Sequence, residues 1–291
     1  MDTTSRHSVL AAPMEQRGIL RVSGREAKYF LQGLITNDVE QVDESSPIYA
    51  ALLTPQGKFL HDFLVIKIGD SLCLDTEKSR LPDLVRRLTM YRLRAAVDLE
   101  DISEGMTVYS IFGADSAILA GEVTGVFIRD PRHVALGYRL YHEADSRLQH
   151  EKLNIQFVDP DAYEAHRIAL GVPDGSRDIP VEKAFPLEYG FDSMNAVSYE
   201  KGCYVGQELT ARTHNRGKVK KALYRLRFGT DSPETGTNVC AGADAVGEVL
   251  TTAGHFALAH VRIDAADGDQ PLRAGEAAII ERIEAPVLAT G

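Results

Sequence analysis

Apolar residues recur at helical spacing in two segments of the first hundred residues. In the first segment they stand at i, i+3, i+4 and i+7, which predicts an amphipathic helix ending near residue 36. These positions are Ala27, Phe30, Leu31 and Leu34. Ser23 and Glu26, just before it, have the spacing of a capping box at a helix start. A second helix is predicted over residues 81–93, with its arginines on the solvent face. Its expected inner face consists of Leu81, Leu84, Val85, Leu88 and Tyr91.

Strands are predicted both before and after a central helix. Residues 63–68 and 72–74 flank a Gly69-Asp70 turn and predict a β-hairpin. Further strands are predicted at residues 108–112, 126–129 and 136–141, and a helix at residues 161–170 with Asp161 as its N-cap. The last third contains short alternating strands, at residues 222–228, 246–251, 257–263 and 277–283. This pattern predicts an α+β chain that ends in a small all-β module.

Residues 172–199 form an irregular stretch rich in proline, glycine and aspartate. A plain connection in a compact domain is rarely this long, and long loops usually carry function. This one leads directly into the most distinctive motif of the chain, so we expect it to help build a functional site.

The composition is that of an ordinary globular protein, with 44% hydrophobic and 25% charged residues among 291. A formal net charge of −10 argues against general nucleic-acid binding. The 3 cysteines are odd in number and far apart, so they predict a reducing compartment rather than a disulfide framework. No apolar run is long enough for a signal peptide or a membrane span. The expectation is a cytoplasmic protein that does not bind membranes.

The motif at residues 201–208, Lys-Gly-Cys-Tyr-Val-Gly-Gln-Glu, places Cys203 between two glycines and beside Lys201. Residues 209–230, which follow it, contain no acidic residue but several basic ones, including Arg212 and Arg216. Cationic neighbours favour the thiolate form of a cysteine, and glycines allow close approach by a ligand. The pattern predicts a reactive thiol that faces something anionic.

The other cysteines carry no such signal. Cys73 sits in an apolar alternating run and is predicted to be core packing. Cys240 lies in a loop rich in small residues. Cys203, His214, Cys240 and His255 do not have the spacing of a zinc site.

The cysteine motif, extended through His214, closely resembles the signature of the YgfZ-type folate-binding proteins and of the iron–sulfur assembly factors in the mitochondrial and alphaproteobacterial branch of that family. Residues 185–188 and 194–198 are similar to the run that precedes this signature. Residues 30–39 resemble a segment of the glycine cleavage aminomethyltransferase, or T-protein. The likeness covers most of residues 17–228.

The resemblance implies a T-protein-like α+β fold of three modules around a central pocket. The last of the three modules is a small β-barrel. We place the modules at residues 1–145, 146–220 and 221–291. The resemblance also implies a role in iron–sulfur assembly, with carrier or client proteins as partners, and a pocket for tetrahydrofolate. Folate contacts are then expected from Asn37, Lys201, Arg212 and Arg216. Cys203 is expected to ligate a cluster bridged to a partner, or to do sulfur chemistry on it.

The sequence departs from the T-protein at two places that matter for catalysis. Where the T-protein has paired aspartates, this chain has His61-Asp62, so only one carboxylate remains to initiate chemistry. Ala169 stands where the T-protein has a folate-contacting glutamate. The resemblance therefore does not imply aminomethyl transfer. A folate-dependent transferase using Asp62, and a cysteine hydrolase pairing Cys203 with His214, stay open as alternatives.

Overall fold

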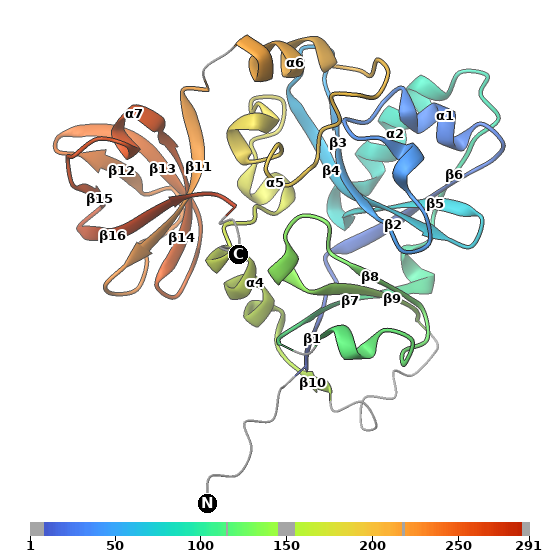
Figure 1. Ribbon diagram of the computed structural model, residues 1–291, viewed down its shortest axis with the longest axis horizontal. Helices are drawn as coiled ribbons and strands as arrows, with labels where there is room; N and C mark the ends of the chain where they lie inside the picture. Colours follow the sequence, from blue (N-terminus) through green and yellow to red (C-terminus); the bar gives the residue numbers. More distant parts are fainter. Residues whose placement is uncertain (1–8, 115, 145–154, 217–218, 287–291) are drawn as a thin grey trace, which may run out of the picture.

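The computed structural model describes residues 9–114, 116–144, 155–216 and 219–286. Two five-stranded sheets stand one above the other, and a closed β-barrel lies beside them (Figure 1). Among the described residues, no helix combines the length and apolar character needed to cross a membrane.

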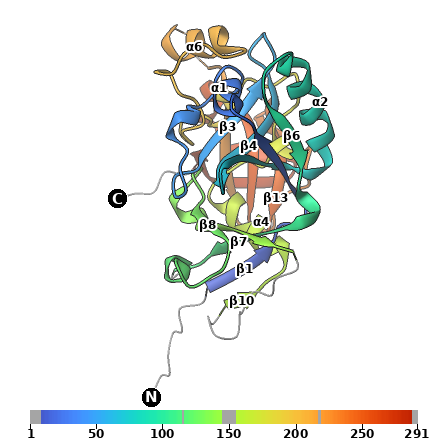
Figure 2. The ribbon, with the colours of Figure 1, turned by 90° about the vertical axis from the view of Figure 1, so that its right-hand side faces the viewer.

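The upper sheet in Figure 1 is antiparallel and carries two helices. Its strands, in order, are β3 (Ile48–Leu53), β4 (Phe59–Ile68), β5 (Ser71–Glu77), β2 (Arg17–Ser23) and β6 (Asp98–Asp101). The helices α1 (Ala27–Gln32) and α2 (Leu81–Arg92) pack their apolar faces against it. Figure 2 shows both helices beside the same sheet. The short helices η1 (Val39–Gln41), η2 (Lys78–Arg80) and η3 (Ser103–Gly105) complete this part.

The lower sheet joins the start of the chain to its middle. Its order is β10 (Ile155–Phe157), β1 (Val9–Pro13), β7 (Met106–Phe112), β9 (Tyr138–Glu143) and β8 (Val126–Arg129). The β10–β1 pair is parallel, and the other pairs are antiparallel. The short helices η4 (Ser116–Leu119) and η5 (Val134–Leu136) flank it. Because β10 pairs with β1, this sheet spans the module boundary placed at residue 145, and the proposed boundaries stay predictions.

The remaining elements link the sheets to the barrel. They are α4 (Pro160–Ala169), α5 (Gly175–Asp178), η6 (Pro186–Tyr189) and α6 (Gln207–Arg216). The barrel has the order β11 (Lys221–Phe228), β14 (Phe256–Arg262), β13 (Asp244–Ala253), β12 (Asn238–Ala241), β15 (Leu272–Ala274) and β16 (Ala277–Glu284), with α7 (Ile263–Ala266) after β14. The predicted C-terminal all-β module is thus confirmed as a closed barrel.

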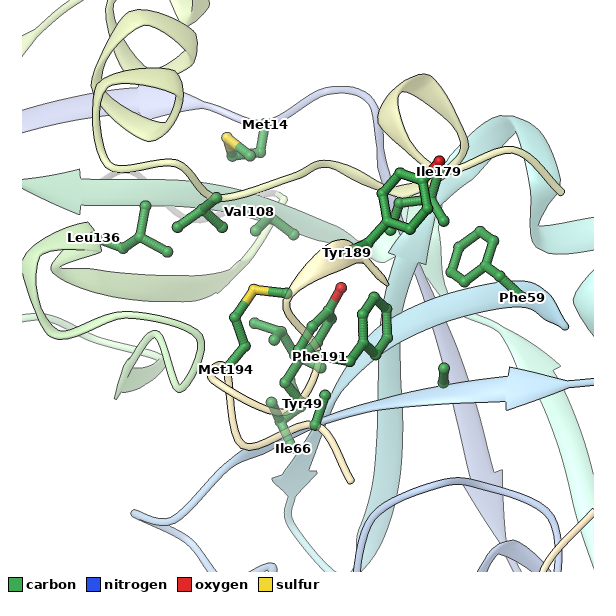
Figure 3. Packing of buried hydrophobic residues seen from close by; sticks show 14 of the residues in the cluster. Met14, Tyr49, Phe59, Ile66, Val108, Leu136, Ile179, Tyr189, Phe191 and Met194 are labelled. Atoms are coloured by element: carbon green, nitrogen blue, oxygen red, sulfur yellow. The ribbon is translucent and has the colours of Figure 1, made fainter. Parts of the chain in front are cut away.

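One hydrophobic core runs through all three parts and fixes the long irregular stretch. Phe191 lies between Tyr49 and Phe59 of the upper sheet, with ring centroids 5.2 and 6.1 Å away (Figure 3). Val108 of the lower sheet and Leu223 of the barrel belong to the same buried cluster. The stretch at residues 172–199 is therefore anchored in the interior by its buried apolar side chains, although other residues of it are exposed.

Several local predictions need correction. The predicted capping box does not form, because Gly24 turns the chain with φ +102° and the Glu26 carboxylate accepts the amide hydrogen of Ala96 instead. Helix α1 also ends earlier than predicted, at Gln32. The N-cap of α4 is Asp159 rather than Asp161. The four apolar positions predicted to be buried in α1 and after it are buried.

Candidate functional site

The cysteine motif lies against the connection between α1 and β3, the segment that resembles the T-protein. The amide of Ser198 donates to the carbonyl of Thr36 at 3.0 Å, and the amide of Val205 donates to the carbonyl of Gly33 at 3.3 Å. The Thr36 hydroxyl returns a hydrogen bond of 2.7 Å to the carbonyl of Ala196. Two motifs that are far apart in the sequence therefore form one structural unit, and Cys203 lies in it.

Lys201 anchors this unit from inside. Its ammonium group is buried and donates to the carbonyls of Ile35 at 2.8 Å and Asn37 at 2.7 Å. It also lies over the Tyr204 ring, 5.3 Å from the centroid. Burial lowers the pKa of Lys201 to about 8, and the Asp38 carboxylate opposes this shift. The side chain that was predicted to contact a cofactor instead holds the backbone beside Cys203.

Replacing Lys201 with methionine should therefore destabilise the motif. The carbonyls of Ile35 and Asn37 would lose this donor inside the protein, and we expect unfolding to cost about 2 kcal/mol less than in the wild type. Urea denaturation measures the difference. Lys28→Met is the control, because Lys28 forms an exposed ion pair with Glu40 and should change stability by less than about 0.5 kcal/mol. Equal effects of the two variants would contradict the anchoring role.

The stability difference between wild type and Lys201→Met should also depend on pH. The folded pKa of Lys201 is about 8, below its ordinary value of 10.5. Between these two values the unfolded chain holds the proton and the folded chain does not, so wild-type stability rises with pH relative to the variant. Denaturation midpoints measured at pH 7.5 and pH 10 test the direction.

The two glycines of the motif differ in their surroundings. Gly206 has φ +84°, and a Cβ there would stand 2.5 Å from the carbonyl oxygen of Thr54 and 3.1 Å from the Cα of Gly57. This contact fixes the start of α6 on the turn between β3 and β4. A Cβ on Gly202 would meet nothing within 4 Å. Of the two glycines, Gly206 has a positive φ and Gly202 does not.

The Cys203 thiol is exposed and lines a surface hollow of ≈ 670 Å³. Gly33 and Gly202 line it, together with side chains from α1 and from the end of α2. These side chains are Glu26, Tyr29, Phe30, Gln32, Leu34, Tyr91, Arg92, Leu93 and Arg94. Two arginines, Arg92 and Arg94, line the same hollow as Cys203. They come from a different part of the chain than the basic residues that the sequence analysis suggested.

The basic residues that follow the motif are placed differently from the prediction. Arg212 is exposed on helix α6. Arg216 ends the same helix, and its side chain lies outside what the structure describes. The cations of the hollow around Cys203 are Arg92 and Arg94. Neither was singled out from the sequence, because a helix end rich in arginine has the pattern of a solvated surface.

His214 is engaged away from the thiol. Its ring stacks on Tyr199 with centroids 3.9 Å apart, and its Nδ1 lies 3.4 Å from the Asp192 carboxylate. Within the described ranges, no hydrogen bond joins His214 to Cys203. The geometry therefore does not favour a cysteine hydrolase.

The prediction for Cys73 is confirmed, whereas Cys240, which was predicted to lie in a loop, belongs to strand β12. Cys73 is buried on β5, and burial raises the pKa of its thiol to about 11. Cys240 is half-buried in the barrel. Cys203 is the exposed cysteine of the three.

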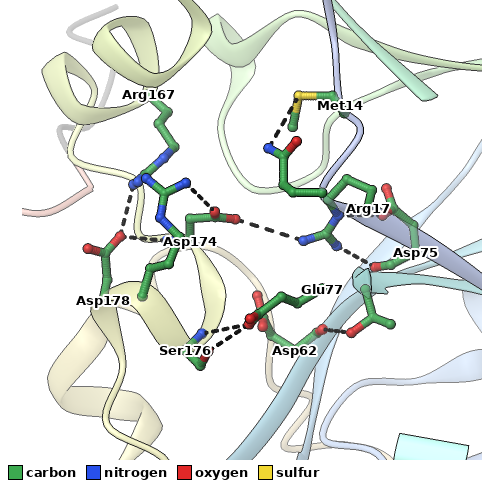
Figure 4. Close-up of polar contacts among 12 residues, drawn as sticks. Met14, Arg17, Asp62, Asp75, Glu77, Arg167, Asp174, Ser176 and Asp178 are labelled. Atoms are coloured by element: carbon green, nitrogen blue, oxygen red, sulfur yellow. Dashed lines mark hydrogen bonds and ion pairs between the residues drawn. The ribbon is translucent and has the colours of Figure 1, made fainter. Parts of the chain in front are cut away.

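Paired charges occupy the region where the two sheets meet α4 and α5 (Figure 4). Arg17 donates to the Asp75 carboxylate at 2.6 Å and lies 3.8 Å from Asp174. Arg167 donates to Asp178 at 2.9 Å, and Tyr141 donates to Asp75 at 2.7 Å. Arg132, Arg139 and Asp130 extend the network from the lower sheet. Each of these charged groups is buried.

Asp62 is the one aspartate that this chain keeps where the T-protein has a pair. It is buried near the same charge network. It accepts a hydrogen bond of 2.9 Å from Tyr49, and burial, followed by the Asp174 charge, raises its pKa. A Cβ on Gly175 would stand 3.2 Å from Asp62 Oδ1, so the start of α5 lies directly over the carboxylate. The geometry places Asp62 in packing rather than at an open surface.

Comparison with known proteins assigns the chain to a family. The family model of the GCVT N-terminal domain matches residues 3–164, and that of the CAF17 C-terminal beta-barrel domain matches residues 220–285. The human iron–sulfur cluster assembly factor IBA57, mitochondrial, is 32% identical over 292 residues, which cover 91% of this chain and 81% of that protein. The chain belongs to the IBA57 family.

Further comparisons agree with this assignment. Mouse IBA57 is 31% identical over 92% of this chain and 81% of its own length. The IBA57 homolog of Mycosarcoma maydis is 35% identical over 76% of this chain, which spans only 59% of that protein's length. The crystal structure of the glycine cleavage aminomethyltransferase T from Bartonella henselae superposes with a TM-score of 0.75, at 14% identity, over 94% of this chain and 85% of that one. The predicted T-protein-like fold is therefore confirmed.

The expectation of a cytoplasmic protein is wrong for this member of the IBA57 family. Its relatives from human, mouse, Mycosarcoma maydis and Pyricularia oryzae are all named as mitochondrial proteins. Dispersed cysteines argue against an oxidising compartment, but they do not distinguish one reducing compartment from another.

Two of the four residues suggested for tetrahydrofolate, Asn37 and Lys201, are engaged in ways that do not fit a folate site in this IBA57-family chain. The Asn37 amide group already donates to the carbonyls of Tyr49 at 2.8 Å and Asn195 at 2.7 Å. Lys201 is bound to backbone carbonyls, and Asp62 lies beneath Gly175. A pterin ring needs a carboxylate that can reach its N–H donors, and unpaired donors would be costly. Asn37, Lys201 and Asp62 therefore offer no free group to a pterin ring.

Proposed function

We propose that this protein assists the assembly or repair of iron–sulfur clusters, with the Cys203 thiolate as one ligand of a cluster that a partner protein shares. The observation that carries the proposal is an exposed cysteine that lines one hollow together with Arg92 and Arg94, on a loop fixed by a buried lysine. The family supports the role, because the human and mouse relatives are named iron–sulfur cluster assembly factors.

The ligand count makes a partner necessary. Iron–sulfur clusters are usually held by four ligands, mostly cysteine thiolates. Within the described residues, no three His, Cys, Asp or Glu side chains are grouped so that they could hold a metal ion. Cys203 would supply one ligand, and a carrier or client protein would supply the others. The cluster is then cargo passed between proteins.

Electrostatics suit this role. A cluster with thiolate ligands carries net negative charge, and arginine side chains beside it stabilise that charge. Arg92 and Arg94 line the hollow that Cys203 faces, although the whole chain has a net charge of −10. Two arginines against one lining carboxylate, Glu26, favour an anionic cargo over a neutral one.

The proposal predicts the loss of client enzyme activity in cells. In cells whose only copy carries Cys203→Ser, activities of 4Fe–4S enzymes should fall to the level of cells without the protein. Cys240→Ser is the control and should leave them unchanged, because that thiol lies in the barrel. Immunoblots should show equal protein levels, since Cys203 is exposed and contributes little packing. Normal enzyme activity with Cys203→Ser at equal levels would contradict the proposal.

A further inference from the structure

A small cavity lies where helix α6 meets the barrel. Its volume is ≈ 260 Å³, and its walls come from the turn between β3 and β4, from η6, from α6 and from the residues that lead into β11. Its apolar lining residues are Phe185, Pro186, Leu187, Leu209 and Val219. Concave, mostly apolar pockets with a few polar groups are the usual sites for small molecules. Cys203 does not line this cavity, so it is distinct from the hollow described above.

Two threonine side chains line the cavity from α6. Thr210 and Thr213 stand three positions apart on one face of the helix, where a packed helix usually carries aliphatic side chains. The Thr210 hydroxyl donates to the carbonyl of Gly206 at 3.4 Å, and the Thr213 hydroxyl makes no hydrogen bond within the described ranges. Because a hydroxyl can donate and accept, Thr213 offers a ligand a hydrogen-bonding group that the described protein does not use.

The charge around the cavity is positive. Lys220 lines it, and the ammonium group of Lys58 lies over the Phe185 ring, 5.8 Å from the centroid. Among the described residues, no carboxylate forms an ion pair with either lysine. Glu188 is the acidic residue of the described walls, and its Oε2 lies 3.3 Å from Nε2 of His260 on the barrel. Two unpaired lysines on a chain with a net charge of −10 favour an anionic ligand.

We infer that this cavity binds a small aromatic monocarboxylic acid. The aromatic body lies between Phe185 and Leu209, and the carboxylate pairs with Lys220 and accepts a hydrogen bond from Thr213. One lining lysine balances one negative charge, which suits a carboxylate. The volume lies below the range of about 300–1,000 Å³ for drug-sized ligands, so the ligand is small.

The ligand joins parts of the chain that hold the cysteine motif. It contacts Gly57 and Leu209, which face each other beside the contact between Gly206 and the turn. A ligand that binds the folded chain and not the unfolded one stabilises the folded chain, so occupancy fixes α6 against η6 and the barrel. The inference does not depend on the cluster chemistry proposed for Cys203.

Calorimetric titration of the full chain with 1-naphthaleneacetate tests the inference. This probe has an aromatic body and one carboxylate, and we expect one site with a dissociation constant of about 0.1–1 mM, as ligand efficiency gives for a molecule of this size. 1-Naphthalenemethanol lacks the charge and should bind roughly 5-fold more weakly, and 1-naphthylmethylamine, with the opposite charge, more weakly still. The thermal unfolding midpoint should rise with the concentration of naphthaleneacetate.

Lys220→Gln and Lys221→Gln form a matched pair of variants. Both lysines are exposed and adjacent in the chain, but Lys221 lines a different cavity, beside Tyr189. Lys220→Gln should weaken naphthaleneacetate binding roughly 5-fold and leave naphthalenemethanol binding unchanged, whereas Lys221→Gln should change neither. Thr213→Phe fills the cavity, so it should remove the binding of both compounds without lowering thermal stability.

Binding that depends on Lys220 but not on Lys221, and that Thr213→Phe removes, would support this cavity as the site. The inference is refuted if naphthaleneacetate gives no saturable heat, if the two lysine variants behave alike, or if the amine binds as tightly as the carboxylate. Binding that survives Thr213→Phe would place the ligand elsewhere and is also a refutation. Cys203→Ser should leave all these titrations unchanged, so a failure here does not touch the proposed function.

Discussion

Replacing Arg17 with methionine is expected to lower the free energy of unfolding by about 3–5 kcal/mol, the usual loss when one partner of a buried ion pair is removed. Arg17 donates to the carboxylate and to the carbonyl of Asp75, both at 2.6 Å, and the Asp75 side chain is 0% exposed. Among the described residues, the carboxylate would then keep Tyr141, at 2.7 Å, and the more distant Arg139, at 3.4 Å.

Arg21 provides the matched control for this experiment on the same strand, β2. It pairs with Glu100 at 2.8 Å, but the two side chains are 39% and 60% exposed. Exposed pairs contribute about 0–1 kcal/mol, so Arg21→Met should be nearly neutral. Chemical denaturation of both variants at pH 7 measures the difference. Similar losses in the two would contradict the role of the buried network in joining the sheets to α5.

Gly206→Ala is expected to lower the free energy of unfolding by about 2–4 kcal/mol, through left-handed backbone strain and overpacking together. The new Cβ would approach the carbonyl oxygen of Thr54 to 2.5 Å, so the start of α6 must move away from the turn between β3 and β4. Because Gly206 is three residues from Cys203, this shift should also slow alkylation or cluster loading at the thiol.

Gly202→Ala is the control on the other side of Cys203. Nothing lies within 4 Å of its ideal Cβ, so we expect a change of less than about 0.5 kcal/mol. Thermal denaturation of the two alanine variants provides the comparison. Equal stability of both would mean that the contact between Gly206 and the turn does not position the motif.

Much of the fold could be predicted because long apolar patterns determine which faces are buried. The helix after Glu26 and the strands of the barrel follow their hydrophobic spacing. The prediction from spacing is wrong at the end of α2. Tyr91 was assigned to the inner face, but it lies beyond the last buried position, Leu88. Helix α6 was not predicted, because its only apolar residues, Leu209 and Ala211, form no helical periodicity.

The candidate site was predicted in part. The exposure of Cys203 followed from its motif, but the identity of its neighbours depends on contacts between distant segments. Lys201 is a basic residue beside a cysteine in the sequence, yet its side chain points inward because the carbonyls of Ile35 and Asn37 converge on it. Arg92 and Arg94 reach the hollow only through the packing of α2 beside α1. No local pattern contains that information.

The central claim is that the Cys203 thiolate ligates a cluster shared with a partner. Mixing the protein with a purified carrier that holds a [2Fe–2S] cluster, and recording visible absorbance and circular dichroism during size-exclusion chromatography, tests it directly. We predict a mixed complex with a cluster spectrum distinct from that of the carrier alone, absent with Cys203→Ser and retained with Cys240→Ser. An unchanged carrier spectrum with the wild type, or an identical mixed complex with Cys203→Ser, would contradict the claim.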